Sequence, residues 1–105
     1  MLSAKKYIIF GLGREYKKYQ RLIESLYVVA YVDNGMAEKK VFNGKPVISV
    51  DRVLDYKFDE IMITSAKYAD EMIGQLVGVN PSLEDKVTLL NDFMDRERIL
   101  KFFEN

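Results

Sequence analysis

A short apolar run that ends in a pair of glycines constrains the fold of this chain more than any other feature. Tyr7 to Phe10 (YIIF) is rich in β-branched and aromatic residues, a pattern typical of a strand covered on both faces in a parallel sheet. Gly11-Leu12-Gly13 follows directly, and a helical pattern comes next. Strand, glycine turn and helix in this order bring backbone N–H groups to a phosphate in α/β domains. We therefore expect an α/β domain with a ligand site at the glycine turn.

The rest of the chain continues to alternate between strands and helices. Residues 49–55 are expected to form a helix that buries Val50, Val53 and Leu54, and Asn43-Gly44 is expected at the tip of a hairpin. This alternation predicts one three-layer Rossmann-like domain over residues 1–105, with four to five mostly parallel strands in the order 3-2-1-4-5 and helices on both faces. The other expected elements are strands at residues 27–32, 60–64 and 87–90, helices at 14–25 and 66–78, and a final helix that starts at Asn91 or Asp92.

Composition narrows the function classes. The 105 residues hold 16 basic and 16 acidic side chains, so the chain lacks the positive charge typical of nucleic-acid binding, and we expect no nucleic-acid partner. The absence of His and Cys excludes His-based catalysis and thiolate chemistry within the chain. No apolar run approaches the roughly 20 residues that span a bilayer. We expect a cytoplasmic binding domain with no membrane span, no catalytic residue and no metal ligand.

Three chain segments are expected to meet at one edge of the sheet. In an open parallel sheet, ligands bind beyond the carboxyl ends of the strands, where the strand order reverses. Asp33 follows Gly11 at close to the roughly 20-residue offset of the carboxylate that holds ribose hydroxyls in nucleotide-binding domains. The residues predicted to line the site are Gly11, Leu12, Gly13, Arg14, Asp33, Asn34, Thr64, Ser65 and Tyr68.

Each of these residues also has a purely structural interpretation. Asp33-Asn34-Gly35 is a strong turn signal by itself, and Ser65 is a good N-cap for a helix. Arg14 and Lys17 could pair with a diphosphate or remain solvated, whereas Tyr68 is a candidate for stacking on a base or facing a sugar. Tyr16 stands where a dinucleotide fingerprint has its third glycine, so its ring is expected to push the helix away or to fill space near the ligand.

Four stretches carry a resemblance to a known family: YIIFGLG, YVVAYVDN, FNGKPVIS and DEIMITSAKYADEMIGQL. Together they resemble the Rossmann-like domain of bacterial surface-polysaccharide enzymes. They are similar to the N-terminal nucleotide-sugar-binding domain of sugar O-acyltransferases of the sialic-acid O-acetyltransferase type. They also resemble domains attached to nucleotide-sugar epimerase/dehydratases, glycosyltransferases and sugar methyltransferases. The resemblance extends from about Lys5 to Phe93.

The resemblance implies a site for a nucleotide-linked sugar such as a UDP-sugar. Gly11-Leu12-Gly13 would hold the diphosphate, Asp33-Asn34 would lie near the nucleoside, and Thr64-Ser65 would close the other side. The domain would then be a non-catalytic or accessory part of polysaccharide synthesis, for lipopolysaccharide or capsule. The β-helix that carries acetyl transfer in the acyltransferases is missing, so the chain is either a stand-alone relative or one domain of a longer protein.

Two other function classes remain open. The chain could be the NAD(P)-binding fragment of an epimerase/dehydratase or an oxidoreductase, which would need a third glycine and a Tyr-x-x-x-Lys base that are not visible. It could instead be a ligand-free interaction module. In that case the segment that contains Leu100, Phe102 and Phe103 would form a homodimer surface or contact a missing catalytic domain.

Overall fold

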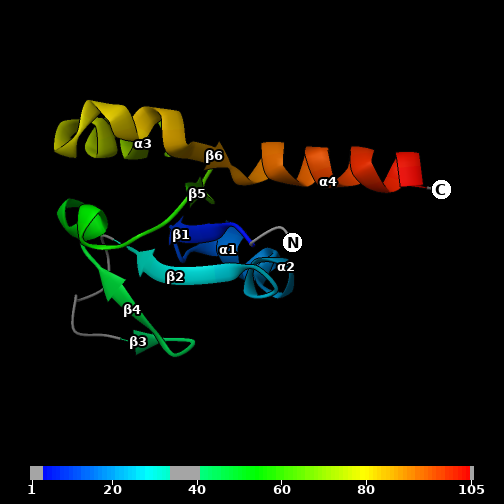
Figure 1. Cartoon of the computed structure of the whole chain (residues 1–105), viewed down its shortest axis with the longest axis horizontal. Helices are drawn as coiled ribbons and strands as arrows, with labels where there is room; N and C mark the ends of the chain where they lie inside the picture. Colours follow the sequence, from blue (N-terminus) through cyan, green and yellow to red (C-terminus); the bar gives the residue numbers. More distant parts are fainter. Residues whose placement is uncertain (1–3, 34–40, 105) are drawn as a thin grey trace.

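The computed structural model describes residues 4–33 and 41–104, with side chains up to residue 97. A single sheet of six strands lies at the centre, in the spatial order β3-β4-β2-β1-β5-β6 (Figure 1). The strands are β1 Lys6–Phe10, β2 Tyr27–Val32, β3 Val41–Phe42, β4 Lys45–Ile48, β5 Glu60–Ile63 and β6 Val87–Leu89. The helices are α1 Arg14–Lys18, α2 Gln20–Glu24, α3 Ala69–Val79 and α4 Leu90–Glu104, with 3-10 helices η1 Val50–Asp55 and η2 Pro81–Lys86.

The expected mostly parallel α/β architecture is confirmed, but the number and order of strands differ from the prediction. Parallel pairing joins β1 to β2 and β5, β2 to β4, and β5 to β6. The sheet has six strands rather than four or five, and its order is not 3-2-1-4-5. The hairpin causes the difference, because its two arms count as separate strands and the antiparallel β3 forms an edge beyond β4.

The hairpin between β3 and β4 turns at Asn43-Gly44, as the sequence predicts. Both residues have positive φ angles, 52° at Asn43 and 75° at Gly44. Positive φ at both central residues is the requirement of the two-residue turn whose twist matches that of the flanking strands. The turn brings Phe42 opposite Lys45 and Val41 opposite Pro46.

Helices cover both faces of the sheet, and each face has its own apolar core. Alternate residues of β1 point to opposite faces, with Tyr7 and Ile9 in one core and Ile8 and Phe10 in the other. The first core is completed by residues of α1, α2 and α4, and the second by residues of η1, α3 and η2. The chain therefore forms the expected three layers.

The predicted helix over residues 14–25 is wrong, because the structure has two short helices. The chain leaves the helical conformation at Tyr19, which has φ −113° and ψ 24° and separates α1 from α2. Aromatic side chains lose rotamer freedom in a helix, and this segment holds two tyrosines. Tyr16 is 1% exposed and Ile23 is fully buried, so each short helix anchors separately in the core beneath it.

Leu54 is also misplaced by the prediction, since its side chain is 52% exposed. The segment forms the 3-10 helix η1, in which residues three apart lie on the same side. Val50 and Val53 therefore both contact the core, while Leu54 is turned away from it.

The last helix, α4, starts at Leu90, directly after β6, and runs away from the sheet towards the C-terminal end of the chain (Figure 1). Leu90 and Phe93 are buried in the first core. In the part of the chain that the structure describes, no helix combines the length and the apolar character needed to cross a membrane.

Candidate functional site

A cleft of about 620 Å³ lies where the carboxyl ends of β1, β2 and β5 meet. Pockets that hold small molecules and cofactors commonly have volumes of about 300–1,000 Å³. The glycine turn after β1 forms its centre, with the end of β2 on one side and the loop from β5 to α3 on the other. The residues that line it are Gly11, Leu12, Gly13, Arg14, Glu15, Asp33, Thr64, Ser65, Ala66, Lys67, Tyr68 and Met72.

The structure thus brings together eight of the nine predicted site residues, and the ninth, Asn34, lies outside the described residues. Lys17 does not line the cleft but a separate surface depression along α1 and α2. Ala66, which the sequence places at the same sheet edge as Thr64 and Ser65, also lines the cleft, whereas sequence reasoning missed Glu15, Lys67 and Met72. For Glu15 and Lys67 the available signal was their place shortly after β1 and β5, at the same edge as the predicted residues, whereas Met72 lies within α3 and had no such signal.

Gly11 and Thr64 form the floor of the cleft. Gly11 has a φ of 109°, a region that favours glycine, and it continues the sheet by donating its N–H to the carbonyl of Val32 at 2.8 Å. The buried hydroxyl of Thr64 donates to the carbonyl oxygen of Gly11 at 2.8 Å. Because the hydroxyl of Thr64, at the end of β5, is bonded to the backbone at the end of β1, this hydrogen bond helps to fix the distance between the two strand ends.

Asp33 supports the glycine turn from the end of β2. Its Oδ2 accepts a hydrogen bond from the backbone N–H of Leu12 at 2.9 Å, in a partly buried position. The carboxylate predicted to face a ribose therefore lies at the cleft and also holds the conformation of the turn.

Gly13 presents open backbone to the cleft. It is the N-cap of α1 and provides no side-chain acceptor to the first turn. The first N–H groups of a helix have no acceptor within that helix, so those of α1 remain available at the turn. A Cβ added at Gly13 would have nothing within 4 Å, and the φ of Gly13 is negative, at −85°. Neither a neighbouring atom nor a positive φ therefore requires glycine here, in contrast to position 11.

The expectation that Tyr16 would disturb the ligand space is wrong. Tyr16 does not line the cleft, because its ring packs edge-on against Tyr31 and Phe42 in the first core. Its hydroxyl accepts a hydrogen bond from Nδ2 of Asn43 at the hairpin tip at 3.3 Å. Burial, followed by the hydrogen bond with Tyr31, raises the pKa of Tyr16 far above its ordinary value. Tyr16 therefore anchors α1 as a neutral core residue.

The loop from β5 to α3 forms the remaining side of the cleft. Ser65 does not cap α3 itself, which starts at Ala69; its hydroxyl oxygen accepts the N–H of Tyr68 at 3.1 Å and closes a turn before the helix. Tyr68 is 50% exposed, and Nζ of Lys67 lies 5.3 Å from the centre of its ring. An exposed aromatic ring at a cleft is a suitable surface for a flat or apolar group of a ligand.

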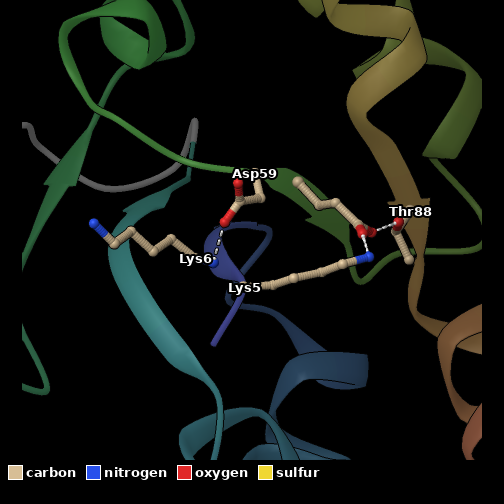
Figure 2. A network of polar contacts seen from close by, with 5 residues as sticks. Lys5, Lys6, Asp59 and Thr88 are labelled. Atoms are coloured by element: carbon tan, nitrogen blue, oxygen red, sulfur yellow. Dashed lines mark hydrogen bonds and ion pairs between the residues drawn. The ribbon is translucent and has the colours of Figure 1, made fainter. Parts of the chain in front are cut away.

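A second polar network lies at the other edge of the sheet and is structural (Figure 2). The N–H of Lys6 donates to Asp59 at 2.7 Å, while Glu60 binds Nζ of Lys5 at 2.6 Å and accepts the hydroxyl of Thr88. Burial acts to raise the pKa of Glu60, but the hydrogen bonds from Lys5 and Thr88 outweigh it, and the pKa is lowered. The carboxylates of Asp59 and Glu60 therefore have a structural role, because their hydrogen bonds join the starts of β1, β5 and β6.

No metal site is found in residues 4–33 and 41–97, where no three acidic, His or Cys side chains are grouped to hold an ion. The cleft contains two carboxylates, Glu15 and Asp33, and two cations, Arg14 and Lys67. The groups that this cleft offers to a ligand are backbone N–H groups, charged side chains and the aromatic ring of Tyr68.

The fold and the cleft define a mostly parallel α/β domain with a ligand-sized cleft at the ends of its strands. Residues 3–87 match the family described as C2185-like, N-terminal, and the chain belongs to that family. The crystal structure of RSP, a Rex-family repressor, is similar in fold, with a TM-score of 0.53 and 19% sequence identity. That similarity covers 96% of this chain and 62% of the repressor chain. No curated protein matches the sequence.

Proposed function

We propose that this domain binds a nucleotide-linked sugar in the cleft around Gly13, as a non-catalytic part of bacterial surface-polysaccharide synthesis. The proposal joins the geometry of the cleft to the resemblance of YIIFGLG and YVVAYVDN to nucleotide-sugar-binding domains. The diphosphate would lie at the glycine turn, and the sugar or base near Tyr68.

The observation that carries the proposal is the open backbone at Gly13. Gly11 is required by its φ angle and by the contact with Thr64, so its presence says nothing about a ligand. Gly13 is under neither constraint and lies on the cleft, beside N–H groups that have no acceptor in α1. A glycine that neither a positive φ nor a neighbouring atom requires supports a ligand that approaches the backbone closely, as a phosphate does.

The short length of α1 limits what the helix itself can contribute. With five residues, α1 has little of the aligned dipole that a long helix directs at an anion. Phosphate binding at this turn therefore depends on individual N–H groups and on Arg14, which is exposed at the cleft. Asp33 contributes by fixing Leu12 and, through it, the direction of these N–H groups.

Binding without catalysis agrees with the side chains present. The chain has no His and no Cys, and the carboxylates among the described residues that line the cleft are Asp33 and Glu15. Asp33 accepts a backbone N–H of the turn, which favours a positioning role over that of a general base.

A thermal-shift panel tests the proposal, with UDP-, CMP-, GDP- and dTDP-sugars, NAD, NADP and coenzyme A. A ligand at 100 times its dissociation constant adds about 2.7 kcal/mol, which raises the melting temperature of a domain of this size by on the order of 10 °C. We expect a shift with one class of nucleotide-sugar and its loss in Gly13→Val. A shift with NAD or NADP alone would replace this function by that of a dinucleotide-binding fragment. No shift with any compound would leave the glycine turn as a structural element.

A further inference from the structure

The two sides of the cleft differ in charge. Among the described residues that line the cleft, those on the β1–β2 side include one cation, Arg14, and two carboxylates, Glu15 and Asp33. On the β5 side, the lining residues from Thr64 to Tyr68 include one charged group, the ammonium of Lys67. Asp70 and Glu71 follow in the first turn of α3, but they are not among the residues that line the cleft. Within the lining residues from Thr64 to Tyr68, Lys67 is therefore the group that can attract an anionic ligand group.

The ammonium of Lys67 lies against the ring of Tyr68, and no carboxylate among the described residues neutralises it. It forms no ion pair with any residue in the described part of the chain, and its Nζ lies 5.3 Å from the ring centre of Tyr68. The turn closed by Ser65 and the N–H of Tyr68 fixes the backbone between them. A cation–π contact at an exposed site is weak, whereas a hydrogen bond between an ammonium and a phosphate is charge-assisted and stronger. A phosphate in the cleft can therefore draw Lys67 from the ring.

We propose that Lys67 binds the distal phosphate of the nucleotide ligand, opposite the N–H groups of the glycine turn. This assignment rests on the proposed nucleotide-binding function and adds a residue that selects diphosphates over monophosphates. The proximal phosphate is bound at Gly13 and Arg14, and the distal one lies towards β5. Movement of Lys67 also uncovers one face of Tyr68 for the ligand.

The test compares binding of UDP, CDP, GDP and ADP with that of the matching monophosphates, by calorimetry on the wild-type chain and on Lys67→Met. Methionine keeps most of the length and the apolar character of lysine without its charge. The control is Lys18→Met, because Nζ of Lys18 also lies 5.3 Å from the ring of the next residue, Tyr19, but outside the cleft. We expect the wild type to bind one diphosphate at least tenfold more tightly than its monophosphate. In Lys67→Met this ratio should fall to about one to threefold, with monophosphate binding unchanged, and Lys18→Met should keep the wild-type ratio.

The outcomes separate this assignment from the function on which it rests. If the wild type binds a diphosphate tightly and Lys67→Met keeps the same ratio, the role of Lys67 is wrong and nucleotide binding stands. An equal loss for both phosphates in Lys67→Met would mean that Lys67 only supports the loop, and would also overturn the assignment. If the wild type binds none of the eight nucleotides, nor any nucleotide-sugar, the proposed function fails together with it.

Discussion

The hydroxyl oxygen of Thr64 lies 2.5 Å from the point where a Cβ on residue 11 would stand. The same hydroxyl donates to the carbonyl of Gly11 at 2.8 Å, across 53 residues of sequence. Thr64 and Gly11 therefore join the ends of β5 and β1, two neighbouring strands of the three at whose ends the cleft lies. The hydroxyl and the backbone N–H of Thr64 also donate to the carbonyl of Phe10, at 3.2 and 3.1 Å, so Thr64 joins β5 to the end of β1 through several bonds.

Replacing Gly11 by Ala should destabilise the domain by about 3 kcal/mol, since it combines a positive φ with an overpacked contact. Urea denaturation would measure the loss. The double variant Gly11→Ala/Thr64→Ala removes the hydroxyl that the new methyl group meets, so it should be less destabilised than the sum of the single variants. Additive effects of the two substitutions would show that Thr64 does not enforce glycine at position 11.

Asp33→Ala should lower the free energy of unfolding by about 1–3 kcal/mol, because the partly buried N–H of Leu12 loses its acceptor. Asp33→Asn keeps an oxygen at the same place and should recover most of this stability. Chemical denaturation of both variants checks the order. A loss in Asp33→Asn as large as that in Asp33→Ala would instead make the negative charge of Asp33, and not the acceptor oxygen, the stabilising feature.

Local patterns were sufficient to predict where the strands and the hairpin lie along the chain, although the number and the order of strands in the sheet differ from the prediction. The YIIF and YVVAYV runs became β1 and β2, and Asn43-Gly44 formed the turn whose φ angles only such residues accept readily. The break at Tyr19 and the outward side chain of Leu54 could not be predicted. Each depends on whether its segment forms a continuous α-helix, or instead short helices or a 3-10 helix. The packing of Tyr16 and Val53 against the sheet decides this, and the local sequence pattern does not show it.

The position of the site followed from topology, but the roles of its residues did not. Parallel strands place their carboxyl ends at one edge, so the residues after β1, β2 and β5 could be grouped from the sequence. That Asp33 supports Leu12, and that Thr64 bonds to Gly11, depends on contacts across 21 and 53 residues of sequence. Such contacts have no local pattern, and neither does the open space beside Gly13.

Gly13→Ala should weaken ligand binding while costing at most about 1 kcal/mol of stability, the usual effect of replacing glycine by alanine at an N-cap. The added methyl group meets no protein atom within 4 Å and would stand where a phosphate approaches the backbone. Gly74→Ala is the matched control, since Gly74 is exposed within α3 and its added Cβ also meets nothing. It should stabilise the domain by about 0.5–1 kcal/mol and leave the ligand-induced thermal shift unchanged. Equal ligand shifts in the two variants would count against a phosphate at Gly13.

The polar network of Lys5, Glu60 and Thr88 predicts how the free energy of unfolding depends on pH. The pKa of Glu60 is lowered from 4.5 in the folded chain, so the unfolded state binds more protons as the pH falls. The stability that Glu60 provides is therefore present above about pH 5 and is lost as the pH falls through 4.5 towards the lowered value.

The variant Glu60→Gln cannot ionise at this position, so its urea midpoint should be lower than that of the wild type at pH 7, and the two midpoints should converge towards pH 3. Asp51→Asn, an exposed carboxylate with no contact to this network, is the control and should follow the wild-type profile. Parallel profiles of Glu60→Gln and wild type between pH 7 and pH 3 would exclude the ion pair with Lys5 as a source of stability.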